Sequence, residues 1–133
     1  MIKKIDHVGL AVKNLDDALA FYRDILGIQP KSIEDVESDK IRSAFLDVGD
    51  AHFEVMEPTS PDSPVAKFLE KRGEGMHHVS LEVDDIRAEL RKLEAKGVAL
   101  IDKEPRMGAH YTVAFVHPRS TGGVLIELTE KTK

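Results

Sequence analysis

The chain has 133 residues, a length that suits one compact domain, and such a chain buries roughly 68% of its unfolded surface. Hydrophobic residues make up 41% and charged residues 32%, as in ordinary water-soluble proteins. The net charge is −5, with acidic and basic residues interleaved, so we expect no nucleic-acid partner. There are no cysteines, which excludes disulfides, thiolate catalysis and cysteine-based zinc sites.

The N-terminal sequence MIKKIDHVGL contains no apolar run of the length found in signal peptides or membrane spans. We therefore expect no membrane partner and a cytoplasmic location.

The predicted elements follow one another in two similar series, joined by a short helix. In the first series we expect a strand at 6–12, a helix at 15–26 that ends before Gly27, and strands at 28–34, 41–48 and 51–57. The loop PTSPDSP then leads to a helix that begins at Ser63-Pro64 and ends near Gly73. The second series has a strand at 77–83, a helix at 86–96 that ends before Gly97, and strands at 98–102, 112–117 and 124–130. Asn14 and Asp85 are suited to cap the two longer helices.

These two series are an internal repeat. DHVGLAV (6–12) matches HHVSLEV (77–83), and HFEVME (52–57) matches LIELTE (125–130). The pair AF also occurs in both, at 44–45 and 114–115. We therefore predict an α+β fold of two tandem βαβββ modules, whose curved mixed or antiparallel sheets form a metal-containing cleft. The domain is expected to span 1–133, with repeat 1 at about 1–57, a linker helix at about 58–75 and repeat 2 at about 76–133.

The repeat selects four potential metal ligands. His7 matches His78 in the first strand of each half, and Glu54 matches Glu127 in the last strand. A pseudo-twofold axis would bring together two imidazoles and two carboxylates, a set that suits a divalent cation. Strand alternation places each of the four on the face opposite its apolar neighbours. Solvent-facing polar residues would give the same alternation, so the symmetric placement is what favours a metal site.

The remaining histidines are weaker candidates. His77 points to the opposite face from His78, and His52 lies two residues from Glu54. His110 and His117 are at a loop and at the end of a strand. Of these, His110 is the one we consider for substrate contact, with an exposed loop position as the alternative.

The sequence resembles methylmalonyl-CoA epimerases of the vicinal-oxygen-chelate superfamily (glyoxalase, bleomycin resistance and dioxygenase proteins) over essentially its whole length. IDHVGLAV at the start of the chain is typical of the superfamily. More specific to the epimerases are two longer stretches, EPTSPDSPVAKFLEKRGEGMHHVSLEVDDI (57–86) and HPRSTGGVLIEL (117–128), together with EPRMGAH (104–110).

The resemblance implies a paired βαβββ fold in a homodimer that interconverts (2R)- and (2S)-methylmalonyl-CoA and serves propionate metabolism. It implies a divalent metal held by His7, Glu54, His78 and Glu127. Cobalt is the metal expected in vitro, and the ligand types also allow Mn²⁺, Ni²⁺, Zn²⁺ or Fe²⁺. A metal that binds the substrate oxygens would stabilise the enolate formed when the C2 proton leaves.

Epimerisation needs one acid–base group on each side of C2, and Glu54 and Glu127 have the required symmetry. The chain departs from some epimerases, which carry glutamine at the position of Glu54 and a separate catalytic glutamate at the position of Ser43. Our hypothesis is that Glu54 partly leaves the metal to act as one base while Glu127 acts as the other.

The residues that contact coenzyme A are less well marked. Arg106, Arg119 and the turn formed by Ser120, Thr121 and Gly122, followed by a second glycine, could bind phosphate or pantetheine groups. A solvated arginine and an ordinary turn are the alternative interpretation.

Three other functions share this fold. Lactoylglutathione lyase (glyoxalase I) can use the same His, Glu, His, Glu set, and activity with methylglyoxal and glutathione would distinguish it. A non-catalytic small-molecule binding protein would not need the four ligands. An extradiol dioxygenase would use iron on two histidines and one glutamate, and a fourth protein ligand would crowd oxygen binding.

Overall fold

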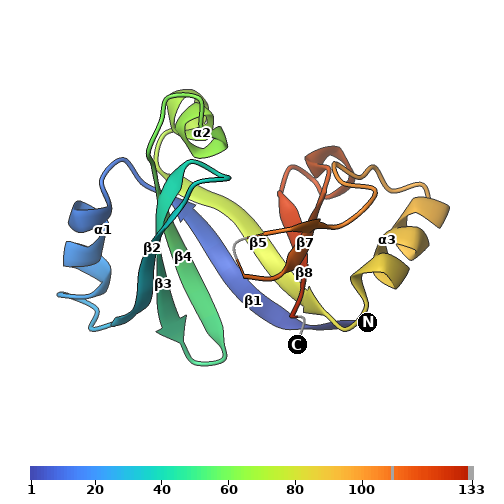
Figure 1. Ribbon diagram of the computed structural model, residues 1–133, viewed down its shortest axis with the longest axis horizontal. Coiled ribbons are helices and arrows are strands. Elements are labelled where there is room, and N and C mark those ends of the chain that lie inside the picture. Colours follow the sequence, from blue (N-terminus) through green and yellow to red (C-terminus); the bar gives the residue numbers. More distant parts are fainter. Residues whose placement is uncertain (109, 132–133) are drawn as a thin grey trace. The chain divides into compact units, whose positions relative to one another are not determined.

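The computed structural model describes residues 1–108 and 110–131. Residue 109, inside the EPRMGAH motif, and residues 132–133, at the end of the predicted second repeat, lie outside the described residues. The chain divides into two compact units. The first unit is His7–His77, and the second combines Met1–Asp6 with the chain from His78 onward. Strands β1 (Ile2–Ala11) and β5 (Gly75–Val83) each pass from one unit into the other (Figure 1). That the whole chain forms one domain stays a prediction.

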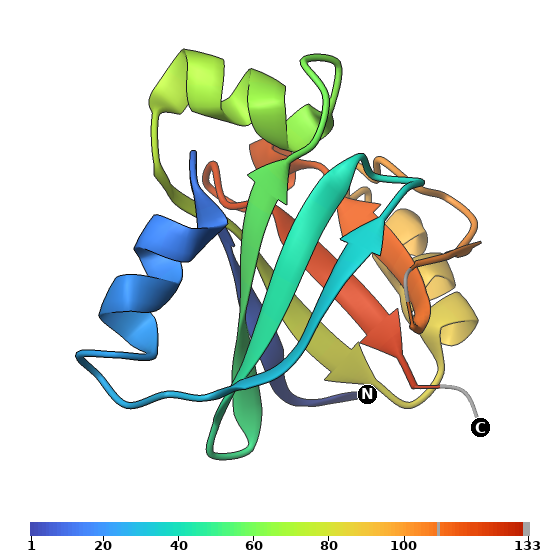
Figure 2. The same ribbon diagram turned by 60° about the vertical axis from the view of Figure 1, so that its left-hand side comes forward.

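The first unit contains a mixed sheet with two helices. Its strands follow the order β2-β3-β4-β1, with β1 parallel to β4 and the other neighbours antiparallel (Figure 2). Helix α1 packs on β3 and β4, and helix α2 packs on β4. The elements added to β1 are α1 (Leu15–Tyr22), β2 (Pro30–Val36), β3 (Ile41–Val48), β4 (Ala51–Pro58) and α2 (Pro64–Arg72).

The second unit repeats this plan. Its strands follow the order β5-β8-β7-β6, with β5 parallel to β8 and the other neighbours antiparallel, and helix α3 packs on β7 and β8. Its elements after β5 are α3 (Ile86–Ala95), β6 (Arg106–Met107), β7 (Thr112–Val116), a 3₁₀ turn (Pro118–Ser120) and β8 (Ile126–Glu130). The predicted α+β class and the order βαβββ are therefore confirmed.

Two predicted elements differ from the structure. The helix predicted to reach 26 ends at Tyr22, and the chain then winds more widely, with the amide of Leu26 donating to the carbonyl of Phe21 at 3.0 Å. The strand predicted at 98–102 forms only one bridge, between Leu100 and Val116, and the strand that pairs with β7 on the side away from β8 is β6. The cause is local, because the Asp102 carboxylate accepts the amide of Phe115 at 2.8 Å and so replaces a backbone bond of the ladder.

In each module, a glutamate at the end of the last strand hydrogen-bonds the N-terminus of the first helix. The predicted caps Asn14 and Asp85 accept amides in the first turns of α1 and α3. In addition, Glu57 accepts the amide of Leu15 at 2.7 Å, and Glu130 accepts that of Ile86 at 2.8 Å. Glu57 and Glu130 are the last residues of the matching segments HFEVME and LIELTE. The sequence repeat therefore includes the contacts that orient each helix on its sheet.

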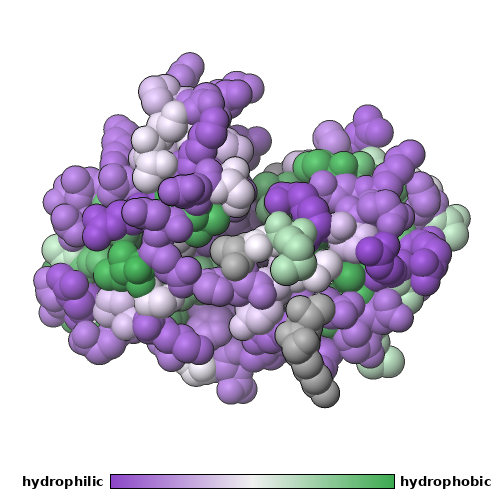
Figure 3. All heavy atoms as spheres, in the orientation of Figure 1, coloured by the Kyte–Doolittle hydropathy of each residue, from purple (hydrophilic) through white to green (hydrophobic). Residues whose placement is uncertain are grey.

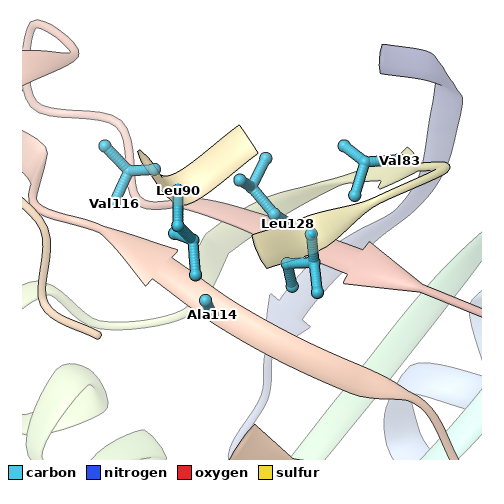
Figure 4. Packing of buried hydrophobic residues seen from close by; sticks show 6 residues of the cluster. Val83, Leu90, Ala114, Val116 and Leu128 are labelled. Carbon is cyan, nitrogen blue, oxygen red and sulfur yellow. The ribbon is translucent and has the colours of Figure 1, made fainter. Parts of the chain in front are cut away.

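The apolar residues of each unit lie between its helices and its sheet, and in the first unit the clusters under α1 and α2 lie on opposite faces of the sheet. In the first unit, Leu15 and Leu19 of α1 pack against Leu46 and Val55 of the sheet. A second cluster, which includes Met56 and the α2 residue Val65, lies below α2. In the second unit, the α3 residues pack against β5, β7 and β8 (Figure 4), and the buried members are Val83, Ile86, Leu90, Ala114, Val116 and Leu128.

The opposite face of the second unit contains buried charge. Asp6 of β1 and Glu82 of β5 both face Lys131, whose Nζ lies 3.0 Å from Asp6 Oδ1 and 3.4 Å from Glu82 Oε1. The Lys131 ammonium also lies 5.5 Å from the centre of the Tyr111 ring. Burial works to lower the pKa of Lys131, but the bond to Asp6 and the charges of Asp6 and Glu82 outweigh it, so the pKa is raised.

Hydrophilic side chains cover most of the face drawn in Figure 3. Among the helices of residues 1–108 and 110–131, none has the length and apolar character needed to cross a membrane.

Leu90→Ala tests the core of the second unit. Leu90 is 2% exposed, and its truncation leaves a cavity below α3, so we expect the free energy of unfolding to fall by roughly 3 kcal/mol in urea denaturation. The control Ile101→Ala, at a side chain that is 52% exposed, should change it by about 0.5 kcal/mol or less. Equal losses in the two variants would contradict the assignment of Leu90 to the core.

Lys131→Met tests the buried charges. It leaves the carboxylates of Asp6 and Glu82 without their cation, and we expect a loss of roughly 2 kcal/mol at pH 7, reduced from the fully buried case because Lys131 is 32% exposed. Because the pKa of Lys131 is raised above 10.5, its contribution is complete below pH 10.5 and is lost as the pH rises through the folded-state pKa. The difference between wild type and variant should therefore shrink only at strongly alkaline pH.

The matched control is Lys103→Met, which removes a lysine whose side chain is 76% exposed. Urea denaturation across pH should show almost no difference from wild type for this variant. A Lys131→Met protein as stable as Lys103→Met would show that the buried carboxylates do not need Lys131.

Candidate metal centre

His7 and Glu54 form a buried pair in the first unit. They lie on β1 and β4, their side chains are 9% and 12% exposed, and His7 Nε2 is 3.4 Å from Glu54 Oε1. Strand alternation explains the placement. Leu10 on β1 and Val55 on β4 point into the cluster under α1, which leaves His7 and Glu54 on the other face of the sheet.

Two residues of β3 contact this pair. The Phe45 ring meets the His7 ring edge-on, with centroids 5.8 Å apart and planes at 81°. The hydroxyl of Ser43, fully buried, donates to Glu54 Oε2 at 3.2 Å. We call His7, Ser43, Phe45 and Glu54 the first half-site. The aromatic edge restricts the imidazole plane, and the hydroxyl restricts the carboxylate.

The second unit contains the corresponding pair. His78 on β5 and Glu127 on β8 are buried, with His78 Nε2 3.9 Å from Glu127 Oε1. The Phe115 ring meets the His78 ring edge-on, with centroids 5.9 Å apart and planes at 87°. Leu128, next to Glu127, points into the opposite cluster under α3. We call His78, Phe115 and Glu127 the second half-site.

The strand registers make the half-sites equivalent. Phe45 is the cross-strand partner of Glu54, and Phe115 is the cross-strand partner of Glu127. On the parallel side, Glu54 pairs with Gly9, two residues after His7, and Glu127 pairs with Ser80, two residues after His78. The matches found in the sequence therefore correspond to matching positions in two separately folded units.

Each half-site suits a divalent cation. Two atoms that share a metal at about 2.1 Å lie roughly 3–4 Å apart, and both His–Glu separations fall in that range. A buried carboxylate is costly unless a positive charge or hydrogen bonds compensate it. Neutral imidazoles and ionised carboxylates are the ligands that borderline divalent metals prefer. The donor set therefore fits the predicted metal.

Three other histidines have structural partners. The His77 ring packs on Phe68 with centroids 5.0 Å apart, on the opposite side of β5 from His78. His52 Nδ1 lies 2.8 Å from Asp47. His117 caps the 3₁₀ turn, where its Nδ1 accepts the amide of the second turn residue. The contact of His77 agrees with the position that strand alternation predicts for it, on the face of β5 opposite His78.

Among the predicted substrate contacts, Arg106 lies nearest to a half-site. Its guanidinium is 5.5 Å from the centre of the Phe115 ring, whose edge meets His78, and Asp102 lies 3.6 Å from it. The arginine side chain is about half exposed, so it can reach a ligand from this position. His110 is also exposed, and its ring contacts Tyr111.

The other residues predicted to contact substrate lie in the turn between β7 and β8, where Ser120 and Thr121 make hydrogen bonds within the protein. Ser120 Oγ accepts the amide of Ala99 at 2.9 Å. Thr121 donates to the carbonyl of Pro118 at 3.1 Å and also contacts the carbonyl of Val124. Gly122 has φ +74°, which favours glycine, and Arg119 is exposed. A role for Arg119, Ser120, Thr121 and Gly122 in substrate binding stays a prediction.

Sequence reasoning did not identify Phe45 or Phe115 as parts of the half-sites. The repeated pair AF at 44–45 and 114–115 was the available signal for the two aromatic rings. The resemblance to the epimerases did point to the position of Ser43, but it gave no sign of the hydrogen bond from Ser43 to Glu54.

Comparisons with known proteins agree on one family. A family model described as Glyoxalase/Bleomycin resistance protein/Dioxygenase superfamily matches residues 6–115. The uncharacterized protein YqjC of Bacillus subtilis is 42% identical over 97% of this chain and 93% of its own length.

Two solved structures extend this likeness to named enzymes. The methylmalonyl-CoA epimerase of Mycobacterium tuberculosis superimposes with a TM-score of 0.93 at 38% identity, covering 99% of this chain and 90% of that one. A methylmalonyl-CoA epimerase in complex with methylmalonyl-CoA and NH₄⁺ also gives a TM-score of 0.93, at 34% identity over 99% of this chain and 96% of that one. The chain therefore has the vicinal-oxygen-chelate fold and belongs to the glyoxalase/bleomycin resistance protein/dioxygenase superfamily, with methylmalonyl-CoA epimerases among its relatives.

Proposed function

We propose that this protein is a methylmalonyl-CoA epimerase in which the two half-sites together hold one divalent cation. The ligands would be His7, Glu54, His78 and Glu127. The observation that carries the proposal is the presence of a buried His–Glu pair at the same place in each module of a chain that resembles these epimerases along its whole length.

Two further facts support it. His7, Glu54 and His78 have the donor types and the burial of a metal-binding group. A related epimerase has been solved with methylmalonyl-CoA bound. A shared cation would compensate both buried carboxylates at once, which explains why each unit can keep an ionised glutamate inside its sheet.

The reaction removes a proton from C2, between a thioester and a carboxylate, and returns one to the other side. The bound cation would supply Lewis acidity toward the substrate oxygens. We assign the two proton transfers to Glu54 and Glu127, because these residues hold equivalent positions in the two modules and the reaction needs one acid–base group on each side of C2. The edge-on rings of Phe45 and Phe115 keep the histidines in place beside them.

The proposal also assigns residues to substrate binding. We assign Arg106 to the negatively charged part of the substrate, since its guanidinium lies against Phe115 of the second half-site. His110 and the turn with Arg119 are assigned to the coenzyme A portion. A homodimer and a cytoplasmic location belong to the same proposal, as does cobalt as the metal in vitro.

Hydrogen exchange tests the activity directly. With Co²⁺-loaded protein in D₂O, we expect both epimers of methylmalonyl-CoA to take up deuterium at C2, followed by NMR, and the rate should fall at least 100-fold after metal removal. Reloading with Co²⁺ should restore it. Absence of metal-dependent exchange would overturn the proposal, and assays with methylglyoxal and glutathione would then test the glyoxalase alternative.

Glu54→Gln and Glu127→Gln test the two assigned bases. Each substitution keeps a metal-ligating oxygen but removes the basic carboxylate, so we expect exchange to fall roughly 100-fold or more in both variants. Co²⁺ affinity, measured by chelator competition, separates loss of a base from loss of the metal. The control is Glu70→Gln on the exposed face of α2, which should exchange at the wild-type rate. Near-normal exchange by Glu54→Gln would remove Glu54 as a base.

A further inference from the structure

The two half-sites share their histidine, glutamate and phenylalanine but differ in the residues around the glutamates, with Gly9 and Ser80 on one side and Ser43 and Val113 on the other. Ser43-Ala44-Phe45 on β3 corresponds to Val113-Ala114-Phe115 on β7, because the two phenylalanines occupy the same register opposite Glu54 and Glu127. The alanines of both triplets are fully buried and point into the helix-covered clusters. Ser43 and Val113 therefore hold equivalent places on the half-site face, and one carries a hydroxyl where the other carries only methyl groups.

The hydroxyl of Ser43 makes a hydrogen bond to Glu54. It is completely buried, and it donates to Glu54 Oε2 at 3.2 Å, while the other oxygen, Oε1, is the one 3.4 Å from His7 Nε2. The two oxygens of Glu54 are thus given different neighbours, a hydroxyl and an imidazole. A carboxylate held in this way presents one defined oxygen to whatever binds beside His7.

We infer that Ser43 is a positioning residue that fixes Glu54 as a ligand through Oε1, and that Glu54 and Glu127 are for this reason not interchangeable. This inference rests on the proposed function, because it assumes a cation beside His7. Without the hydroxyl, Glu54 can rotate and offer both oxygens. Val113 can give no such bond to Glu127, so the second carboxylate is not restrained from the equivalent position.

The test compares Ser43→Ala, Ser43→Thr and Val113→Ala with wild type. We expect Ser43→Ala to bind Co²⁺ roughly 10-fold more weakly in chelator competition, the effect typical of losing a hydrogen bond to a metal ligand. Its Co²⁺ visible absorption spectrum should change as Glu54 alters its coordination. Ser43→Thr, which keeps the hydroxyl, should restore both properties. Val113→Ala removes methyl groups but no hydrogen-bond donor at the matching position, and it should leave the affinity within about twofold of wild type.

Exchange at C2 supplies the second readout. Because the inference separates the two glutamates, Ser43→Ala should slow deuterium uptake from one epimer several-fold more than from the other, whereas Val113→Ala should not. Thermal unfolding of each variant without metal shows whether the protein is folded. Should Ser43→Ala fold poorly, Ser43→Val, which has the shape of Ser43→Thr but lacks the hydroxyl, gives the same comparison.

The outcomes separate this inference from the proposed function. Wild-type affinity and an unchanged Co²⁺ spectrum in Ser43→Ala would overturn the role of Ser43 and leave the epimerase proposal intact. If wild type binds Co²⁺ but exchanges neither epimer, the epimerase proposal fails, while the comparison of metal affinities still decides the role of Ser43. Failure of wild type to bind Co²⁺ would overturn both.

Discussion

The feature on which the rest depends is the burial of a carboxylate next to a histidine inside each sheet. Ionised Glu54 and Glu127 are removed from most of the water that would stabilise them, and such burial is tolerated only with compensation. The second unit shows how the chain meets the same requirement elsewhere, where Lys131 lies against Asp6 and Glu82. The half-sites contain no lysine or arginine among their defining residues, and a divalent cation is a compensation that the ligand types of each half-site suit.

Strand alternation is what makes this arrangement possible. Phe53 and Val55 on β4 point into the cluster under α1, and Ile126 and Leu128 on β8 point into the cluster under α3. Glu54 and Glu127, which lie between these residues, therefore point to the other face of the sheet. The same strands end in Glu57 and Glu130, which bind the first amides of α1 and α3. Each of these two strands therefore contributes core residues, a half-site glutamate and the glutamate that binds the helix, at a fixed spacing along the chain. A one-residue shift would exchange the faces and move Glu54 or Glu127 into the apolar cluster.

Much of this was readable from the sequence, because duplication shows equivalent residues without any structure. The His–Glu pair of each half-site, the helix caps and most strands follow from the repeat and from alternation. What could not be read depends on side chains that meet across strands. The ladder stops at Asp102 because its carboxylate accepts the amide of Phe115. The sequence of residues 98–102 gives no sign that a side chain replaces a backbone carbonyl there. The bond from Ser43 to Glu54 likewise depends on register between neighbouring strands, which alternation alone does not set.

The small difference between the half-sites has a chemical reason under the proposed reaction. The intermediate at C2 is planar, so two related carboxylates suit its two sides, yet its thioester and carboxylate ends are not alike. A perfectly symmetric centre would bind such a molecule equally well in two orientations and would place the thioester wrongly half of the time. Ser43, which binds Glu54, distinguishes the first half-site, and Arg106, which lies over Phe115, distinguishes the second. Duplication thus provides the matched acid–base pair, and substitutions at single positions provide the direction in which the substrate binds.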